Sequence, residues 1–230
     1  MSESASISNS EQVRRFVFSS KDTSEEHEAV EILIPEQLQA SYGFYTWPCA
    51  PYLAWYLYDQ RKDLPGKHIL ELGAGTALPS ILAAKCGARV TITDSAFYPQ
   101  TLQHIHRVCV SNKLSPDKYQ IIGITWGFFF KQLFELSDID LIIGSDCFYE
   151  PHLFEDILVT VAFLLEHCPH SKFLCSYQER SADWSIEHLL HKWSLTCRSI
   201  DINSIGVNSC LNLSESIQDH TIHLLEITKI

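Results

Sequence analysis

An acidic residue followed by two closely spaced glycines stands out at residues 71–76, which read ELGAGT. Gly73 and Gly75 let the backbone turn sharply and let a ligand approach without a Cβ in the way. Glu71 stands just before them, and Leu78 takes the place of the third glycine of the dinucleotide fingerprint. A carboxylate there would repel a pyrophosphate and attract a cation. The pattern therefore favours S-adenosylmethionine, which carries an ammonium and a sulfonium. An ordinary strand-to-helix turn is the alternative.

Three further side chains could complete a cofactor site beside this turn. Asp94 follows Gly73 by 21 residues and closes an apolar run, where an acid of this kind of fold accepts hydrogen bonds from ribose hydroxyls. Trp126 follows another apolar run and could stack on adenine, and Trp47 could cap the cofactor from the N-terminal side. The alternatives are a turn-forming role for Asp94 and core packing for both tryptophans.

The elements that would position these side chains alternate between short apolar runs and segments with a helical period. Beyond Lys67 this alternation is typical of βαβ units around a parallel sheet. The sequence predicts strands at 68–72, 89–93, 119–125, 139–144, 172–178, 195–200 and 221–228. It predicts helices after Thr76, through 102–109, along 153–165 and along 184–193. No helix is evident between the last two strands, so we expect them to pair antiparallel.

The chain upstream of this alternation divides into two parts. Residues 1–12 are polar and serine-rich, so we expect a disordered tail. Runs at 13–18 and 29–34 predict a strand pair within a β extension that spans 13–47, and a helix is expected from Pro48. Residues 13–230 are predicted to form one domain. Five parallel strands followed by an antiparallel pair match the Rossmann-like α/β fold of class I methyltransferases, a seven-stranded sheet with helices on both faces.

Composition restricts the partners and the location of the protein. The 230 residues include 28 acidic and 17 basic side chains, and the formal charge of −11 repels phosphate backbones and anionic lipids. A basic protein partner is therefore favoured over nucleic acid or a membrane, and a monomer is the default. Without a signal peptide or a long apolar span, we expect an intracellular protein of the nucleus or cytoplasm with reduced cysteines. No histidine or cysteine spacing suggests a metal site.

Several short motifs occur in order along the chain. They are WPCA at 47–50, ELGAGT at 71–76, TDS at 93–95, TWG at 125–127 and SDCFYE at 145–150. Together they resemble the seven-β-strand protein methyltransferases of methyltransferase family 16, over roughly residues 13–230. The resemblance implies S-adenosylmethionine as cofactor and a side chain of another protein as methyl acceptor. Lysine is the commonest acceptor in the family, and the branch that this chain resembles most is associated with histone arginine.

The resemblance also implies roles for individual residues. It assigns cofactor binding to Trp47, Glu71, Gly73, Gly75, Asp94 and Trp126. We expect Ser145 to join this cofactor site as well. The resemblance places Asp146 and Tyr149 of the DxxY motif at the mouth where the acceptor enters. The interior of the DxxY motif contains Cys147, whose thiol beside the acid contributes no obvious chemistry. We therefore expect Cys147 to pack in the core.

Proton removal separates the two acceptor classes. Lysine, with a pKa of about 10.4, costs about 4 to 5 kcal/mol to deprotonate at pH 7, whereas arginine, at about 13.8, costs about 9. Arginine attack therefore requires a carboxylate that binds the guanidinium and accepts its proton. Asp146 is the candidate, and Glu150 would join it in a two-acid clamp or else compensate a helix N-terminus. Tyr149 would orient the acceptor, form an aromatic wall or pack in the core.

Three functional classes remain compatible with these residues. The first is a protein methyltransferase that acts on a basic, flexible segment such as a histone tail. The second is a small-molecule methyltransferase on the same fold, which would favour an enclosed acceptor pocket over an open acidic groove. The third is a cofactor-binding interaction module without turnover, against which the intact Asp146 and Tyr149 argue. We expect the first.

Overall fold

A central sheet dominates the computed structural model, which describes residues 11–20, 29–37, 42–205 and 221–230. Seven strands form this sheet in the order β5-β4-β3-β6-β7-β9-β8. They are β3 (His68–Glu71), β4 (Arg89–Asp94), β5 (Tyr119–Gly123), β6 (Leu141–Ser145), β7 (Phe173–Gln178), β8 (Leu195–Ile200) and β9 (Ile222–Lys229). Every predicted strand of the alternating region therefore belongs to one sheet, and the predicted α/β fold class is confirmed.

The strand order contains a switch point between β3 and β6. From β3 the chain adds β4 and β5 in parallel on one side, then returns to add β6 and β7 in parallel on the other. Ligands of open α/β sheets bind beyond the carboxyl ends of the strands at such a point. On the far side, β9 runs antiparallel between β7 and β8. The expected antiparallel pairing of the last two strands is confirmed.

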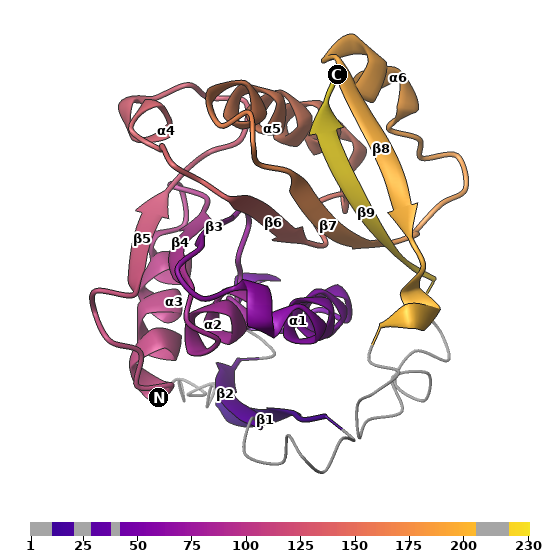
Figure 1. Ribbon diagram of the computed structural model, residues 1–230. Helices are drawn as coiled ribbons and strands as arrows, with labels where there is room; N and C mark the ends of the chain where they lie inside the picture. The colour runs from indigo at the N-terminus through magenta and orange to yellow at the C-terminus, as the bar shows by residue number, and fades with distance from the viewer. Residues whose placement is uncertain (1–10, 21–28, 38–41, 206–220) are drawn as a thin grey trace, which may run out of the picture.

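Helices cover both faces of the sheet (Figure 1). One face carries α1 (Cys49–Asp59), α2 (Leu78–Lys85) and α3 (Pro99–Ser111), and the other carries α4 (Lys131–Phe134), α5 (Phe154–His167) and α6 (Glu187–Lys192). Successive strand residues point to opposite faces. Accordingly Ile69 joins the apolar cluster beneath α1 to α3, whereas Leu70 joins the cluster beneath α5. Burial on both faces explains why the central strands are continuous apolar runs.

An antiparallel hairpin forms a further layer over α1 to α3, as Figure 1 shows. Its strands are β1 (Gln12–Phe18) and β2 (Val30–Glu36), which confirms the predicted strand pair. Phe18 packs on Trp55 of α1, with ring centroids 4.8 Å apart. Asn112 at the end of α3 accepts a hydrogen bond from the Leu33 amide and donates one to its carbonyl. The hairpin is thus fixed to the helices. Residues 1–10 of the predicted tail lie outside the described residues, and β1 begins at Gln12.

The helix predicted along 184–193 is shorter in the structure. It spans only Glu187–Lys192 as α6. The hydroxyls of Ser181 and Ser185 accept hydrogen bonds from the amides of Asp183 and Glu187, which fixes turns in place of an earlier helical turn. The single-turn α4 was not predicted, and most of the loop between β8 and β9 lies outside the described residues. The seven cysteines within the described ranges are free. None of the helices in these ranges combines the length and the apolar character of a membrane-spanning segment.

Candidate active site

The glycine turn follows β3 at the carboxyl edge of the sheet. Gly73 and Gly75 have φ angles of +63° and +52°, in the left-handed region that favours glycine. A Cβ on Gly73 would lie 2.7 Å from Cζ2 of Trp126, so the indole lies directly against the backbone of the turn. No atom approaches a Cβ built on Gly75 more closely than 3.8 Å. The turn therefore brings Trp126 against Gly73 and leaves space beside Gly75, as a ligand cradle requires.

Asp94, the last residue of β4, fixes this turn. Its Oδ2 accepts a hydrogen bond of 2.8 Å from the Gly75 amide, and its Oδ1 accepts one of 2.8 Å from the Ser95 amide. Burial raises the pKa of Asp94, and the two amide donors oppose that effect. A carboxylate has about four acceptor positions, so two remain for hydroxyl donors. The predicted ribose contact is compatible with this geometry and stays a prediction.

Glu71 lies behind the turn rather than at an exposed strand tip. Its side chain is completely buried, and Oε2 accepts a hydrogen bond of 3.2 Å from the Ser80 amide in α2. Burial raises the pKa of this carboxyl to about 8. Its other oxygen, Oε1, has no hydrogen-bond partner within the described part of the chain. A buried acid with an unpartnered oxygen would be stabilised by a nearby cation, so the residues of this edge fit a cationic cofactor.

The segment before α1 lies across the same turn. Gly43 is the nearest neighbour of a Cβ built on Gly75, and the hydroxyls of Thr46 and Thr76 lie 2.9 Å apart. Trp47 stacks on Tyr42 with ring centroids 5.9 Å apart, and its indole N–H donates to the Tyr42 carbonyl. The predicted approach of the Trp47 segment to the cofactor edge is therefore present in the fold, whereas its cofactor contact stays a prediction.

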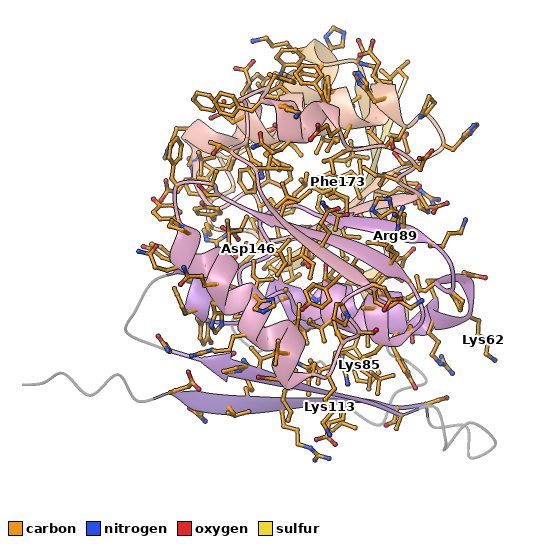
Figure 2. The ribbon with its side chains drawn as sticks, turned by 90° about the vertical axis from the view of Figure 1, so that its left-hand side faces the viewer. Lys62, Lys85, Arg89, Lys113, Asp146 and Phe173 are labelled. Carbon is orange, nitrogen blue, oxygen red and sulfur yellow. The ribbon has the colours of Figure 1, made fainter. Side chains whose placement is uncertain are left out.

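Asp146 follows β6 on the other side of the switch point. Figure 2 shows it at the opposite edge of the sheet from Arg89, which begins β4. Its φ of +58° is left-handed and the residue is only 7% exposed. The guanidinium of Arg180 holds both carboxylate oxygens, with Nη1 2.9 Å from Oδ1 and Nη2 2.6 Å from Oδ2. The Gln178 amide also donates to Oδ1 at 3.3 Å.

Sequence reasoning missed Arg180. The residue lies two positions beyond β7, and β7 is the parallel neighbour of β6. Parallel strands end at the same edge of a sheet, so a basic residue at this position could have been matched with Asp146 once the strand order was assumed. The hydrogen bonds to Asp146 raise the pKa of Arg180, which keeps its charge. The pair is therefore a charge-assisted, bidentate contact.

The remaining predicted residues near Asp146 and Arg180 differ in exposure and in hydrogen-bond partners. Tyr149 is 36% exposed, and burial raises the pKa of its hydroxyl to about 12. Oε2 of the exposed Glu150 lies 3.3 Å from Nε2 of His152, and among the described residues no hydrogen bond or ion pair joins Glu150 to Asp146. Ser145 is the last residue of β6, in register with Ser176.

Cys147 is buried and donates its thiol to the Leu72 carbonyl, so its predicted packing role is confirmed. No group of three metal-ligating side chains occurs within the described ranges.

The chain is similar to known proteins in both sequence and fold. Residues 26–189 match the model of the lysine methyltransferase family. The chain is 48% identical over 204 residues to "Histone-arginine methyltransferase METTL23" of Xenopus laevis, covering 88% of this chain and 86% of the relative. It is 30% identical over 153 residues to "EEF1A lysine methyltransferase 3" of Xenopus tropicalis, covering 64% and 66%.

Among solved structures, a "SAM Dependent Methyltransferase" of Agrobacterium tumefaciens superposes with a TM-score of 0.58 over 86% of this chain and 67% of that chain, at 15% identity. At this identity the likeness supports the fold alone. The family match, by contrast, confirms the resemblance drawn from the ordered motifs. The chain belongs to the lysine methyltransferase family and is a protein methyltransferase that uses S-adenosylmethionine.

Proposed function

We propose that the protein transfers methyl groups to arginine in a basic, flexible segment of a protein, such as a histone tail. The observation that carries this proposal is the pair of hydrogen bonds that the guanidinium of Arg180 donates to the two carboxylate oxygens of Asp146. This contact supports the proposal, because a carboxylate that accepts two parallel hydrogen bonds from one guanidinium is oriented to accept them from another. The relatives named as histone-arginine methyltransferases support the same acceptor.

Binding of the cofactor is assigned to the β3–β4 side of the edge. Gly73 and Gly75 would give access to the backbone, and Asp94 would accept ribose hydroxyls. The buried carboxyl of Glu71 would lie behind the cationic groups of the cofactor, whose charge favours its ionised form. Trp47, Trp126 and Ser145 would complete the enclosure. S-adenosylmethionine supplies a sulfonium methyl that is open to in-line attack. The protein therefore needs chiefly to align the acceptor lone pair with the methyl and to exclude water.

The acceptor side is assigned to Asp146 and Tyr149. Asp146 would bind the acceptor guanidinium and take up its proton as the new bond forms, because deprotonating free arginine at neutral pH costs about 9 kcal/mol. Tyr149, with a pKa of about 12, keeps its proton at neutral pH and can donate a hydrogen bond that orients the acceptor. Glu150 faces His152, so its place in a two-acid clamp requires a change of side-chain orientation on acceptor binding.

Lysine is the second candidate acceptor, favoured by the family description and by the lysine methyltransferase relative. An ammonium is a point charge that cannot match both oxygens of a carboxylate with parallel hydrogen bonds. The arrangement around Asp146 therefore supports arginine over lysine. We also propose that residues 13–230 act as one domain, and that a histone acceptor would require the protein to enter the nucleus.

The test uses the purified protein with isotopically labelled S-adenosylmethionine and three acceptor pools: core histones, a cytosolic protein fraction and a small-molecule extract. Mass spectrometry then locates the label. We expect label on arginine of a basic segment, and we expect an otherwise identical peptide with lysine at that position to remain unlabelled. Label confined to lysine would replace the arginine assignment, and label confined to the small-molecule extract would remove the protein acceptor.

A further inference from the structure

Arg180 occupies the position that an acceptor guanidinium would need. Both oxygens of Asp146 accept hydrogen bonds from Arg180, and the backbone amide of Gln178 donates a further hydrogen bond to Oδ1. The Asp146 residue is 7% exposed, so little of the carboxylate faces solvent. A second guanidinium cannot form the same two parallel hydrogen bonds while Arg180 remains. An acceptor arginine can therefore reach Asp146 only if Arg180 leaves.

The fold provides a place for the displaced side chain. Arg180 lines a pocket of about 510 Å³ between α6 and the strands β7, β8 and β9. Glu187 and Trp184 also line this pocket, and a carboxylate and an indole ring both attract a guanidinium. The Arg180 side chain is already 24% exposed. Residues 179–186 belong to no helix or strand, so the backbone places no regular hydrogen-bond ladder in the way of this movement.

The exchange of partners has a chemical consequence. A guanidinium that replaces Arg180 restores both hydrogen bonds to Asp146, so the buried carboxylate is paired before and after the exchange. An ammonium that replaces it restores only one such contact and leaves the carboxylate incompletely paired. The contact that closes the site in the absence of acceptor therefore also selects among acceptors.

We propose that Arg180 is an internal substitute for the acceptor guanidinium, which closes the acceptor subsite at Asp146 until an acceptor arginine displaces it into the neighbouring pocket. This inference rests on the proposed arginine acceptor and adds a specificity-determining residue to it. A binding-competent state populated at 0.1 to 10% lowers the apparent affinity of its ligand by the same fraction. Removal of Arg180 should therefore lower the acceptor KM by about tenfold or more.

The first experiment measures kcat and KM for an arginine peptide and its lysine counterpart with Arg180→Ala and Arg180→Lys. Arg198→Ala is the matched control, because Arg198 also pairs with a carboxylate, Glu226, at 2.6 Å but lies on β8. We expect Arg180→Ala to lower KM for the arginine peptide at similar kcat and to reduce discrimination against lysine. A KM that is unchanged or raised in Arg180→Ala would overturn the proposal. If kcat also falls in that variant, Arg180 is a static positioning residue instead. Arg180→Lys, which conserves the charge, gives the same decision if the alanine variant does not fold.

The second experiment does not depend on activity. Methylguanidinium and methylammonium are titrated into the cofactor-bound protein at 10 mM, and the melting temperature is recorded. We expect methylguanidinium to stabilise Arg180→Ala selectively, with no such effect on Arg198→Ala and none from methylammonium. Equal responses in Arg180→Ala and the parent protein, or none in either, would overturn the exchange. If the parent protein methylates no arginine at all, the proposed function fails, whereas this binding result still reports on Asp146.

Discussion

The two sides of the switch point between β3 and β6 are built differently. On the β3–β4 side, backbone amides and buried groups hold the site: Asp94 fixes Gly75, and Trp126 lies against Gly73. On the β6–β7 side, two charged side chains from different loops hold one another, because the guanidinium of Arg180 forms an ion pair with the carboxylate of Asp146. In the proposed assignment, the cofactor side is therefore organised before binding, whereas the acceptor side must exchange partners.

Asp146→Asn should have the largest effect, and it acts on the acceptor side alone. The amide keeps the size of the side chain and removes its charge, so a contact made chiefly in the transition state is lost. Such a loss costs about 3 to 4 kcal/mol, a few hundredfold in the rate of methyl transfer. Calorimetry should find an unchanged Kd for S-adenosylmethionine. A variant that binds the cofactor and transfers methyl at the parent rate would make Asp146 a structural residue.

Gly73→Ala should affect the cofactor side instead. The new Cβ would meet Trp126 at 2.7 Å, so the indole must shift. We expect the Kd for S-adenosylmethionine to rise by about a hundredfold, equivalent to about 2.7 kcal/mol. Gly66→Ala is the matched control, because Gly66 has a similar φ of +77° and no atom within 4 Å of its Cβ position. Equal losses of affinity in the two variants would attribute the effect to backbone strain.

Glu71→Gln should change how stability depends on pH. The native carboxyl keeps its proton up to about pH 8 because it is buried, whereas the unfolded carboxyl loses it near 4.5. The native state therefore binds more protons between these values, and the free energy of unfolding falls as the pH rises, by at most about 1.4 kcal/mol per pH unit. Denaturant unfolding without cofactor should show the glutamine variant gaining on the parent from pH 5.5 to 7.5.

Glu135→Gln, at the exposed residue that follows α4, is the control for that measurement, since the ion pair of Glu135 with Lys131 lies at the surface. We expect the pH profile of this control to follow the parent. If the pH profile of Glu71→Gln follows the parent as well, the buried carboxyl does not titrate in this range. Ionisation of Glu71 then costs the cofactor side no stability.

Glu150→Gln should have the smallest effect. Its carboxylate is exposed and pairs with His152, and exposed pairs contribute little. We expect methyl transfer to change by less than about threefold, measured beside Asp146→Asn under the same conditions. A loss comparable to that of Asp146→Asn would restore the two-acid clamp, and it would show that the acceptor side rearranges around both acids.

Local patterns predicted much of the fold and the glycine turn after β3. The apolar runs in β3, β6 and β7 identified these strands, because a strand buried on both faces needs a continuous apolar run wherever the chain places it. The glycine turn was recognisable for a similar reason, since Gly73 and Gly75 meet a local backbone requirement. These features depend on neighbours in the chain, so they can be read from it.

Only the tertiary structure decided the features that join distant segments. Asp146 and Arg180 are 34 residues apart, and their pairing depends on the parallel registry of β6 and β7. Asn112 meets Leu33 across 79 residues, because the hairpin packs on α3. The sequence predicted a carboxylate at Glu71 that attracts a cation, and only the fold showed that this side chain is fully buried and hydrogen-bonded to α2. The sequence determined which side chains could act, and their burial and partners came from contacts that no local pattern specifies.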